Sequence, residues 1–336
     1  MKRTNRKRML TYPFLRLRNL FHPENFQGWG VQRRYFEGWY FKMVPSDGKE
    51  AIALIPGVAM DAAGKRQSFI QILDGKRKKA YYHAFPFESF SAQKYDFEVR
   101  IGDSLFSKNG LILRMENNVG QLYFRNLVPW PKRAYSPGIM GPFTFVPFME
   151  CYHGIVSMDH HIEGTLSLDG IPPIDFSGGR GYIEKDWGHS FPSSYIWLQT
   201  NHFSQPGHSL KCSVAKIPWL GSSFVGFIAG LWWNGRLIRF TTYNRSSLIK
   251  SFADMEKVDI VLENPKYRLE IHAERDAPTA LASPILGLMD GRIEETMNAT
   301  THIRLTERRS KALLFEDTGK HTGLEVAGQV SEIFIG

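Results

Sequence analysis

Cysteine, long apolar runs and glycine-rich nucleotide motifs are all scarce in this chain of 336 residues. Cys151 and Cys212 are the only cysteines, too few for the disulfide framework of a small secreted domain, so we expect reduced thiols. No stretch approaches the roughly 20 apolar residues of a membrane-spanning helix. Gly178-Gly179 lacks the strand–loop–helix setting of a phosphate cradle. These absences favour a soluble protein, expected in the cytoplasm, whose contact with a membrane would be peripheral.

Positive charge is in excess, with 42 Lys and Arg against 33 Asp and Glu. Part of the excess lies in the first eighteen residues, as Lys2, Arg3, Arg6, Lys7, Arg8, Arg16 and Arg18. One interpretation is a solvated tail. Another is attraction to an anionic membrane surface, because Leu15 and Leu17 alternate with basic residues. A nucleic-acid partner is not expected, since no zinc-finger spacing or recognition-helix pattern accompanies the charge.

Short strand-like segments fill the chain from about residue 31 onward, and aromatic residues reach 13% of the composition. Long helical periods are missing, which argues against an alternating α/β fold. Asn117-Asn118 lies between two such segments and predicts a hairpin. Residues 127–147 contain five prolines and predict a long connecting loop. One helix is expected, either near residues 133–151 or at the C-terminus.

Two long aromatic segments, at residues 34–42 and 195–203, suggest that the chain is built from two similar halves. Closing each half would remove exposed strand edges and leave a cavity in each half or between them. The sequence therefore predicts an all-β fold with two barrel or sandwich domains in tandem. Its parts are a basic lead-in at residues 1–30, an N-terminal domain at 31–152 and a C-terminal domain at 153–336.

The strongest candidate for chemistry lies in residues 181–192. Glu184 and Asp186 are two positions apart and therefore share one face of a strand, and His189 follows at a Gly-Pro loop. A carboxyl group close to Trp187 loses solvation of its ionised form, which raises its pKa and makes it a candidate general acid. The competing interpretation is that Asp186 accepts backbone N–H bonds at the turn.

Strand alternation also places polar groups among aromatic side chains elsewhere. Glu37 shares a face with Tyr35 and Trp39, while Gln199 and Asn201 share a face of the second aromatic strand. Buried polar groups need hydrogen-bond partners. Those partners are either protein groups that hold the strand register or a ligand, and the sequence leaves both open.

Two further patterns contain residue types found in metal or nucleophile sites. His160 and His161 precede Glu163, but neighbouring residues of a strand point to opposite faces, which argues against one shared metal ion. Cys151 has no matching base nearby in the sequence and fits a small buried residue. We therefore expect neither a metal nor a cofactor.

The same residues resemble the tocopherol cyclase family. The resemblance is carried by Glu37 to Lys42, by Asp186 to Pro192 and by Trp197 to Asn201, and it runs from about residue 33 to near the C-terminus. Supporting matches are Phe85-Pro86-Phe87, Gly141-Pro142-Phe143, Met149 to Gly154, and Leu324 to Gly328. This family is similar to carotenoid hydratases and lipocalin-like pericyclases, which implies that both domains are lipocalin-like and enclose a ligand cavity.

The resemblance implies an enzyme, an intramolecular lyase of the isomerase type, that closes the chroman ring of a prenylated quinol without a cofactor. An acid protonates the prenyl double bond, and the phenol oxygen attacks the tertiary carbocation. Aromatic faces would stabilise the cation, and exclusion of bulk water would prevent hydration. The alternatives are a non-catalytic carrier of prenyl lipids and a hydratase or pericyclase relative acting on an isoprenoid. The plant enzymes carry a plastid-targeting extension, whereas this chain starts with a short basic lead.

At the matched positions, Asp186 is the predicted proton donor and Glu37 or Glu184 the alternative. His189 would relay the proton or order the loop. The hydrophobic substrate would be held by aromatic and amide side chains: Trp39, Trp187, Phe191, Tyr195, Trp197, Gln199 and Asn201.

Overall fold

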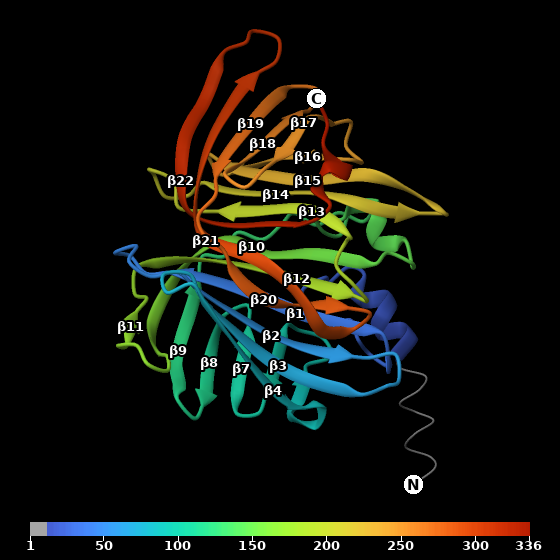
Figure 1. Ribbon diagram of the computed structural model, residues 1–336, viewed down its shortest axis with the longest axis vertical. Helices are drawn as coiled ribbons and strands as arrows, with labels where there is room; N and C mark the ends of the chain where they lie inside the picture. Colours follow the sequence, from blue (N-terminus) through green and yellow to red (C-terminus); the bar gives the residue numbers. More distant parts are fainter. Residues whose placement is uncertain (1–11) are drawn as a thin grey trace.

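The computed structural model describes residues 12–336, and this part of the chain is almost entirely β-structure (Figure 1). Its strands form two large sheets in which every strand pair is antiparallel, which confirms the predicted all-β fold. Within these residues, no helix combines the length and apolar character needed to cross a membrane. The basic residues Lys2 to Arg8 lie outside the described part of the chain.

The first sheet has twelve strands in the spatial order β4-β3-β2-β1-β12-β10-β9-β8-β7-β6-β5, with β11 paired to β10. The strands are β1 (Tyr35–Val44), β2 (Ile52–Met60), β3 (Arg66–Asp74), β4 (Lys79–Pro86), β5 (Phe90–Ala92), β6 (Glu98–Ile101), β7 (Ser104–Ser107), β8 (Gly110–Met115), β9 (Asn118–Arg125), β10 (Cys151–Ser167), β11 (Ile174–Asp175) and β12 (Gly179–Gly188). A short 3-10 helix, η1 (Phe87–Ser89), separates β4 from β5. Buried apolar side chains such as Phe41, Phe106 and Ile183 pack the concave interior. The β8–β9 pair confirms the hairpin predicted at Asn117-Asn118.

The second sheet has ten strands in the order β16-β15-β14-β13-β22-β21-β19-β18-β17, with β20 paired to β21. The strands are β13 (Ser194–Thr200), β14 (Ser209–Trp219), β15 (Ser222–Trp233), β16 (Arg236–Thr241), β17 (Ser247–Ala253), β18 (Lys257–Glu263), β19 (Tyr267–Glu274), β20 (Thr279–Ile285), β21 (Leu288–Glu307) and β22 (Leu313–Gly328). Leu198, Phe240 and Ile271 belong to its own buried core.

Both sheets repeat one arrangement around their first strand. In the first sheet β1 lies between β2 and β12, and β12 is the last strand of that sheet in the sequence. In the second sheet β13 lies between β14 and β22, and β22 is again the last strand in the sequence. This order agrees with the two similar halves inferred from the aromatic segments. The change of sheet comes between Gly188 and Ser194, whereas the sequence places the division at residues 152/153. The reason is that the Pro-rich residues 127–147 connect β9 and β10, which are neighbours in one sheet.

Helical structure is shorter than expected from the sequence. The region near residues 133–151 holds only the 3-10 helix η2 (Gly141–Phe145), and the C-terminus holds only η3 (Val330–Ile333). Proline at the start of η2 and the prolines on either side of it prevent a longer helix there.

The two sheets pack against each other through their outer faces. Tyr40 of the first sheet meets Trp197 and Met297 of the second in a separate buried apolar cluster. Gln71 of β3 reinforces the contact, because its side-chain oxygen accepts from the Ala282 N–H at 3.0 Å and its amide donates to the Ala282 carbonyl at 3.4 Å. Each strand at this contact therefore presents one face to its own core and the other to the partner sheet.

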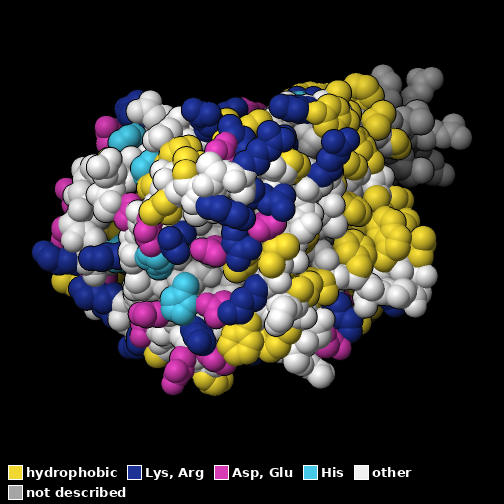
Figure 2. Space-filling view, turned by 90° about the horizontal axis from the view of Figure 1, so that it is seen from above, with side chains coloured by type: hydrophobic (Ala, Val, Ile, Leu, Met, Phe, Trp, Pro, Cys, Tyr) yellow, Lys and Arg dark blue, Asp and Glu magenta, His cyan; other side chains and the backbone are white. Residues whose placement is uncertain are grey.

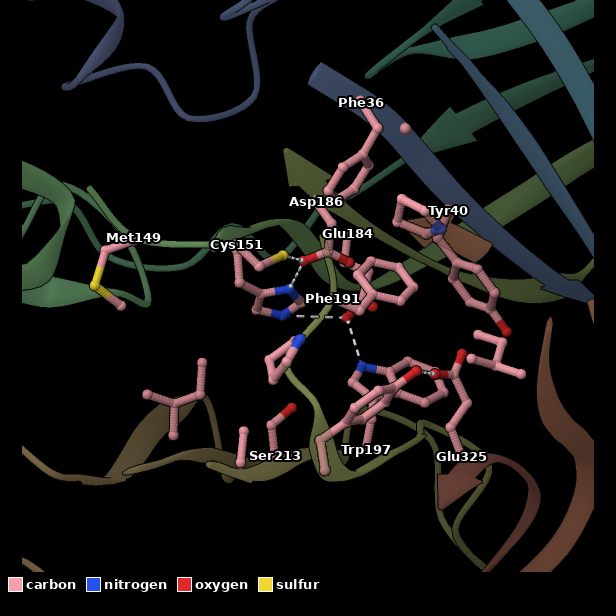
Figure 3. A pocket seen from close by; sticks show the side chains of 18 of the residues that line it. Phe36, Tyr40, Met149, Cys151, Glu184, Asp186, Phe191, Trp197, Ser213 and Glu325 are labelled. Atoms are coloured by element: carbon pink, nitrogen blue, oxygen red, sulfur yellow. Dashed lines mark hydrogen bonds and ion pairs between the residues drawn. The ribbon is translucent and has the colours of Figure 1, made fainter. Parts of the chain in front are cut away.

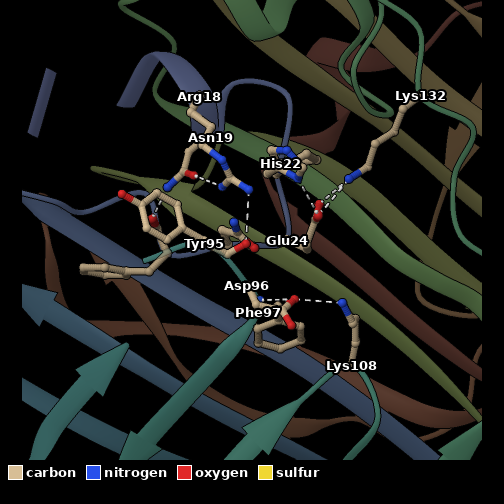
Figure 4. Close-up of polar contacts among 12 residues, drawn as sticks. Arg18, Asn19, His22, Glu24, Tyr95, Asp96, Phe97, Lys108 and Lys132 are labelled. Carbon is tan, nitrogen blue, oxygen red and sulfur yellow. Dashed lines mark hydrogen bonds and ion pairs between the residues drawn. The ribbon is translucent and has the colours of Figure 1, made fainter. Parts of the chain in front are cut away.

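The lead-in segment is tied to the first sheet. It contains a helix at residues 12–19, and Arg18 donates to the Tyr95 carbonyl at 3.2 Å (Figure 4). Glu24 accepts hydrogen bonds from Lys132 at 2.7 and 2.8 Å. These contacts tie the segment to the loop between β5 and β6 and to the connection between β9 and β10.

Candidate active site

A cavity of about 190 Å³ lies between the two sheets. A cavity needs only about 10–15 Å³ to hold a single water, so this cavity has room for an organic ligand. Its wall is largely apolar, and its aromatic members are Phe36, Tyr40, Phe69, Phe143, Phe191, Tyr195, Trp197, Phe224, Phe227 and Tyr243. Of the two locations that the sequence allows, within the halves or between them, the structure selects the second for this cavity.

Alternation along β1 and β12 brings two carboxyl groups to the cavity. Gly38 and Tyr40 of β1 line it and pair in register with Asp186 and Glu184 of β12. Glu184 and Asp186 thus share one strand face, as predicted, and both side chains belong to the cavity wall (Figure 3).

His153 of β10 joins these two carboxyl groups. Its Nδ1 lies 2.7 Å from Asp186 Oδ1, and its Nε2 lies 3.4 Å from Glu184 Oε2. Figure 3 shows the resulting line of contacts running from Asp186 through the ring to Glu184 and on to Trp197. His153 was not predicted as a site residue from the sequence pattern, although it lies within the Met149–Gly154 match. The missing information was the pairing of β10 with β12, which sets His153 opposite Asp186.

The same three groups have ligand atoms within 4.8 Å of one another, close enough to hold a metal ion. The imidazole, however, directs one nitrogen to each carboxyl group, so a metal bound through either nitrogen would replace one of these contacts. The arrangement suits proton exchange along the line Asp186–His153–Glu184.

Glu184 has the more buried carboxyl group of the pair, with 4% of the residue exposed. Its Oε2 accepts from the Tyr182 hydroxyl at 2.5 Å and from Trp197 Nε1 at 3.1 Å. Among residues 12–336, no hydrogen bond is formed to Oε1. Burial raises the pKa of Glu184, partly opposed by His153 and Lys211, and so favours the form that carries a proton.

Asp186 is the more accessible member, with 25% of its side chain exposed. Cys151 lies beside it, with Sγ 3.8 Å from Asp186 Oδ1. Burial and the neighbouring Asp186 charge raise the pKa of Cys151 well above its usual value, so the thiol stays neutral. This agrees with the structural interpretation of Cys151, although the residue also lines the cavity.

A second pair of carboxyl groups, Glu295 and Glu325, lies on neighbouring strands of the second sheet. The Tyr40 hydroxyl donates to Glu295 at 2.5 Å, and the Tyr195 hydroxyl donates to Glu325 at 2.7 Å. Burial raises the pKa of Glu295 to about 8. Burial, reinforced by the Glu295 charge, also raises the pKa of Glu325. Both residues line the cavity. Local sequence pattern does not predict these two residues, because the Tyr40–Glu295 contact joins residues 255 positions apart.

Glu37, the alternative proton donor, lies on the opposite face of β1 and outside the cavity wall. Its carboxylate is 2.5 Å from Lys185 Nζ, and both side chains are fully buried. The backbone N–H groups of Gln27 and Gly28 and the Tyr35 hydroxyl also donate to it. Both carboxylate oxygens are thus saturated with donors, which makes Glu37 an anchor for the lead-in segment.

Trp39 and Trp187 belong to this anchor and do not line the cavity. The Lys185 ammonium lies 4.9 Å from the Trp39 ring centre and 4.7 Å from that of Trp187. The Trp39 indole donates to the Glu24 carbonyl at 3.0 Å. Odd-numbered positions of β1 and β12 face the core of the first sheet. The two tryptophans therefore stabilise the Lys185 ammonium, whereas the sequence predicts a substrate cation beside them.

The remaining predicted residues divide into two groups. Gln199 accepts from Lys42 at 3.0 Å and Asn201 donates to Asp159 at 2.9 Å, and both amides lie outside the cavity wall. His189 also lies outside the cavity wall, and the hydrogen bond that its backbone carbonyl accepts from the Gly287 N–H at 2.8 Å does not involve its side chain. Besides Glu184 and Asp186, the predicted residues that line the cavity are Phe191, Tyr195 and Trp197.

Comparisons with known proteins agree with this picture. The family model described as tocopherol cyclase-like matches residues 121–328. The chain is 25% identical over 209 residues to a probable chloroplastic tocopherol cyclase of Oryza sativa subsp. japonica, and 26% identical over 211 residues to a chloroplastic tocopherol cyclase of Zea mays. Each match covers 59% of this chain but only 43% of the relative.

Among solved structures, a crystal structure of CghA with Sch210972 is similar, with a TM-score of 0.55. The match covers 88% of this chain and 89% of CghA at 9% identity, and it concerns the fold, which is lipocalin-like as predicted. The matched family region spans more than half of the chain and contains His153, Glu184, Asp186, Glu295 and Glu325. This protein therefore belongs to the tocopherol cyclase-like family.

Proposed function

We propose that this protein is an enzyme that cyclises a prenylated quinol to a chroman by acid catalysis and without a cofactor. The observation that carries the proposal is the series of contacts Asp186–His153–Glu184, which lies in the wall of an apolar, aromatic cavity between the two sheets. Membership of the tocopherol cyclase-like family supports the same chemistry.

The first step is protonation of the prenyl double bond. The neutral Glu184 carboxyl group donates its proton to the less substituted alkene carbon. The π electrons form the new C–H bond and leave a tertiary carbocation. The phenol oxygen then forms the C–O bond and loses its proton, which returns to the enzyme. Substrate and product are isomers, so no oxidant or reductant is consumed.

The two carboxyl groups of the line have different tasks in this scheme. Glu184 is more deeply buried, and its raised pKa keeps a proton ready for transfer. Asp186 is closer to solvent and holds the imidazole of His153, through which the proton on Glu184 is restored. The sequence ranks Asp186 first as donor, whereas burial favours Glu184. Separate replacement of the two residues distinguishes the two assignments.

Aromatic rings surround the position of the developing cation. Tyr40 and Trp197 pack edge to face, with 5.5 Å between their ring centres. The Phe191 ring centre lies 5.4 Å from that of Phe36 and 6.0 Å from that of Tyr195. Ring faces stabilise a nearby cation, and the effect increases where water is excluded. Glu184 becomes an anion at the moment the cation forms, which adds a favourable charge interaction in a medium of low polarity.

Glu295 and Glu325 provide the polar counterpart for the quinol ring. Each accepts a hydrogen bond from a tyrosine, and the raised pKa of each favours the protonated form, so the pair offers both donors and acceptors to phenolic oxygens. They take the orienting role that the sequence assigns to Gln199 and Asn201.

A carrier of prenyl lipids would need the apolar wall but not the buried acids. Four carboxyl groups line this cavity, two buried (Glu184 and Glu295) and two partly buried (Asp186 and Glu325), and within residues 12–336 none forms an ion pair with a lysine or arginine. Such an arrangement destabilises the fold, and groups of this kind are concentrated at catalytic sites. A hydratase would use the same acid with water as the nucleophile. The two enzymatic reactions differ in product, since hydration adds the mass of one water and cyclisation leaves the mass unchanged.

The test is incubation of the full-length protein with a prenylated hydroquinone under reducing conditions, followed by chromatography and mass spectrometry. We expect an isobaric chroman from the wild type. Glu184→Gln should lower kcat by at least about 10²-fold, the usual contribution of a general acid, and Asp186→Asn should lower it less. Glu163→Gln, at an exposed position of β10, is the matched control and should retain activity. Wild-type rates in both Glu184→Gln and Asp186→Asn would exclude this acid centre.

A further inference from the structure

A group of exposed hydrophobic side chains lies near one end of the cavity, apart from others that are spread over the surface. Three segments contribute them: the lead-in at residues 12–21, the region from η2 to Phe148, and the turn of the β14–β15 hairpin. All three lie on the right of Figure 1. Hydrophobic side chains also gather on the right of Figure 2, which shows the molecule from above.

The apolar rim, as we name this surface, consists of Phe14, Leu17, Phe21, Phe145, Phe148, Trp219 and Leu220. Leu220 is 79% exposed, Phe14 65% and Phe148 55%, values that are unusual for large apolar residues grouped in one place. Scattered single residues of this kind need no explanation, but a contiguous group indicates a binding surface.

Aromatic contacts join the rim to the cavity. Trp219 lies 5.6 Å from Phe148 and 5.9 Å from Phe143, measured between ring centres. Phe143 and its neighbour Phe224 both line the cavity. Phe21 of the lead-in contacts Phe145, with 5.8 Å between the two ring centres. A ligand leaving the cavity on this side would pass directly onto apolar side chains.

Leu220 is a poor residue for its own position. It is the first of two turn residues between the paired Trp219 and Ser222, and its φ is +47°. Such left-handed turn positions favour Asn, Asp or Gly, and other residues cost about 1–2 kcal/mol there. Exposure of a leucine to water adds no stability. Neither the turn nor the core explains this side chain, which points to a contact outside the molecule.

We propose that the apolar rim inserts into the surface of an anionic lipid membrane and connects the cavity with the bilayer. The lead-in supports this partner, because exposed Arg16 lies between Phe14 and Leu17 on one short helix, and the chain has a net charge of +9. Apolar side chains enter the headgroup region while basic side chains bind anionic lipids. A second copy of the chain is the less favourable occupant, since it would carry the same positive charge.

This surface makes physical sense of the cavity's position. A long prenyl ligand is far more soluble in a bilayer than in water, and an opening set against the bilayer removes the need to cross water. The proposal goes beyond the cyclisation chemistry and does not depend on it, because membrane binding requires no turnover.

The experiment is co-sedimentation of the full-length protein with vesicles of phosphatidylcholine, alone or mixed with phosphatidylglycerol. We expect binding to the mixed vesicles that weakens as salt is added. Leu220→Asn should weaken binding about tenfold, the effect of losing one buried leucine side chain, and should leave the unfolding midpoint unchanged or higher because the turn is relieved of strain. Phe148→Glu should weaken binding at least as much.

Met255→Glu is the matched control, because Met255 is 84% exposed in the turn between β17 and β18. Its vesicle binding should equal that of the wild type. Equal binding by Leu220→Asn, Phe148→Glu and the wild type would overturn the proposal. So would size-exclusion data showing a dimer that Leu220→Asn converts to a monomer, with no binding to vesicles. Cyclase activity on detergent-solubilised substrate should survive in both rim variants, which separates this result from the fate of the proposed reaction.

Discussion

Carboxyl groups lie on both faces of the strand pair β1 and β12, one on the core face and two on the cavity face. On the core face, Glu37 is paired with Lys185 and surrounded by backbone N–H donors. On the cavity face, Glu184 and Asp186 share a histidine, and within residues 12–336 neither forms an ion pair with a lysine or arginine. Glu184 and Lys185 are adjacent in one strand, yet Glu184 faces the cavity and Lys185 forms a buried ion pair in the core.

The difference shows how burial can serve either structure or chemistry. A buried carboxylate with a fixed positive partner keeps its charge and locks a segment in place. A buried carboxyl group with a titratable partner keeps its proton and can give it up. The following predictions test whether the two faces differ in this way.

The largest effect on stability is expected from Glu37→Gln. Removal of the charge leaves Lys185 buried without its partner, which should lower the free energy of unfolding by about 3–5 kcal/mol. Chemical denaturation measures the change. The double variant Glu37→Gln/Lys185→Met should recover much of the loss, because no unpaired charge remains. Glu184→Gln should cost far less, and equal losses at the two faces would remove the distinction between them.

A pH-dependent effect is expected at Glu295 of the cavity. Its pKa is about 8 in the folded protein against 4.5 for the free group, so the folded state binds the extra proton between these values. The stability that the neutral group contributes is full below pH 4.5 and is lost as the pH rises through 8. Compared with Glu295→Gln, the wild type should lose stability by up to about 1.4 kcal/mol per pH unit in this window. Parallel stability–pH curves would show that Glu295 ionises normally.

The smallest effect is expected from Cys151→Ser. The thiol lies beside Asp186, and its pKa is raised well above the usual value. It should therefore react only slowly with thiol reagents near neutral pH until the protein unfolds. Its replacement should change kcat by no more than a few-fold. Rapid labelling of the folded protein that abolishes activity would assign Cys151 a direct chemical role.

Local pattern in the sequence was enough for the all-β fold, the β8–β9 hairpin and the shared face of Glu184 and Asp186. These features depend on turn residues and the two-residue period of a strand. The period divides a strand into two faces but does not say which face meets a cavity. For that reason Glu37 and Trp39 were expected at the site, although they face a core.

Long-range pairing decided the rest of the site. His153 reaches Asp186 only because β10 lies beside β12, and Tyr40 reaches Glu295 only because the two sheets pack by their outer faces. The domain division at residue 152 failed to match the change of sheet for the same reason. A Pro-rich segment looks alike in sequence whether it joins two sheets or two neighbouring strands.

The most direct test of acid transfer from the cavity face is the reaction of a prenylated hydroquinone in heavy water. Transfer of an enzyme-bound proton to the double bond predicts one deuterium in the chroman, on the ring carbon next to the newly bonded carbon, and no such product from Glu184→Gln. A chroman that forms at the wild-type rate without deuterium on carbon would contradict the account.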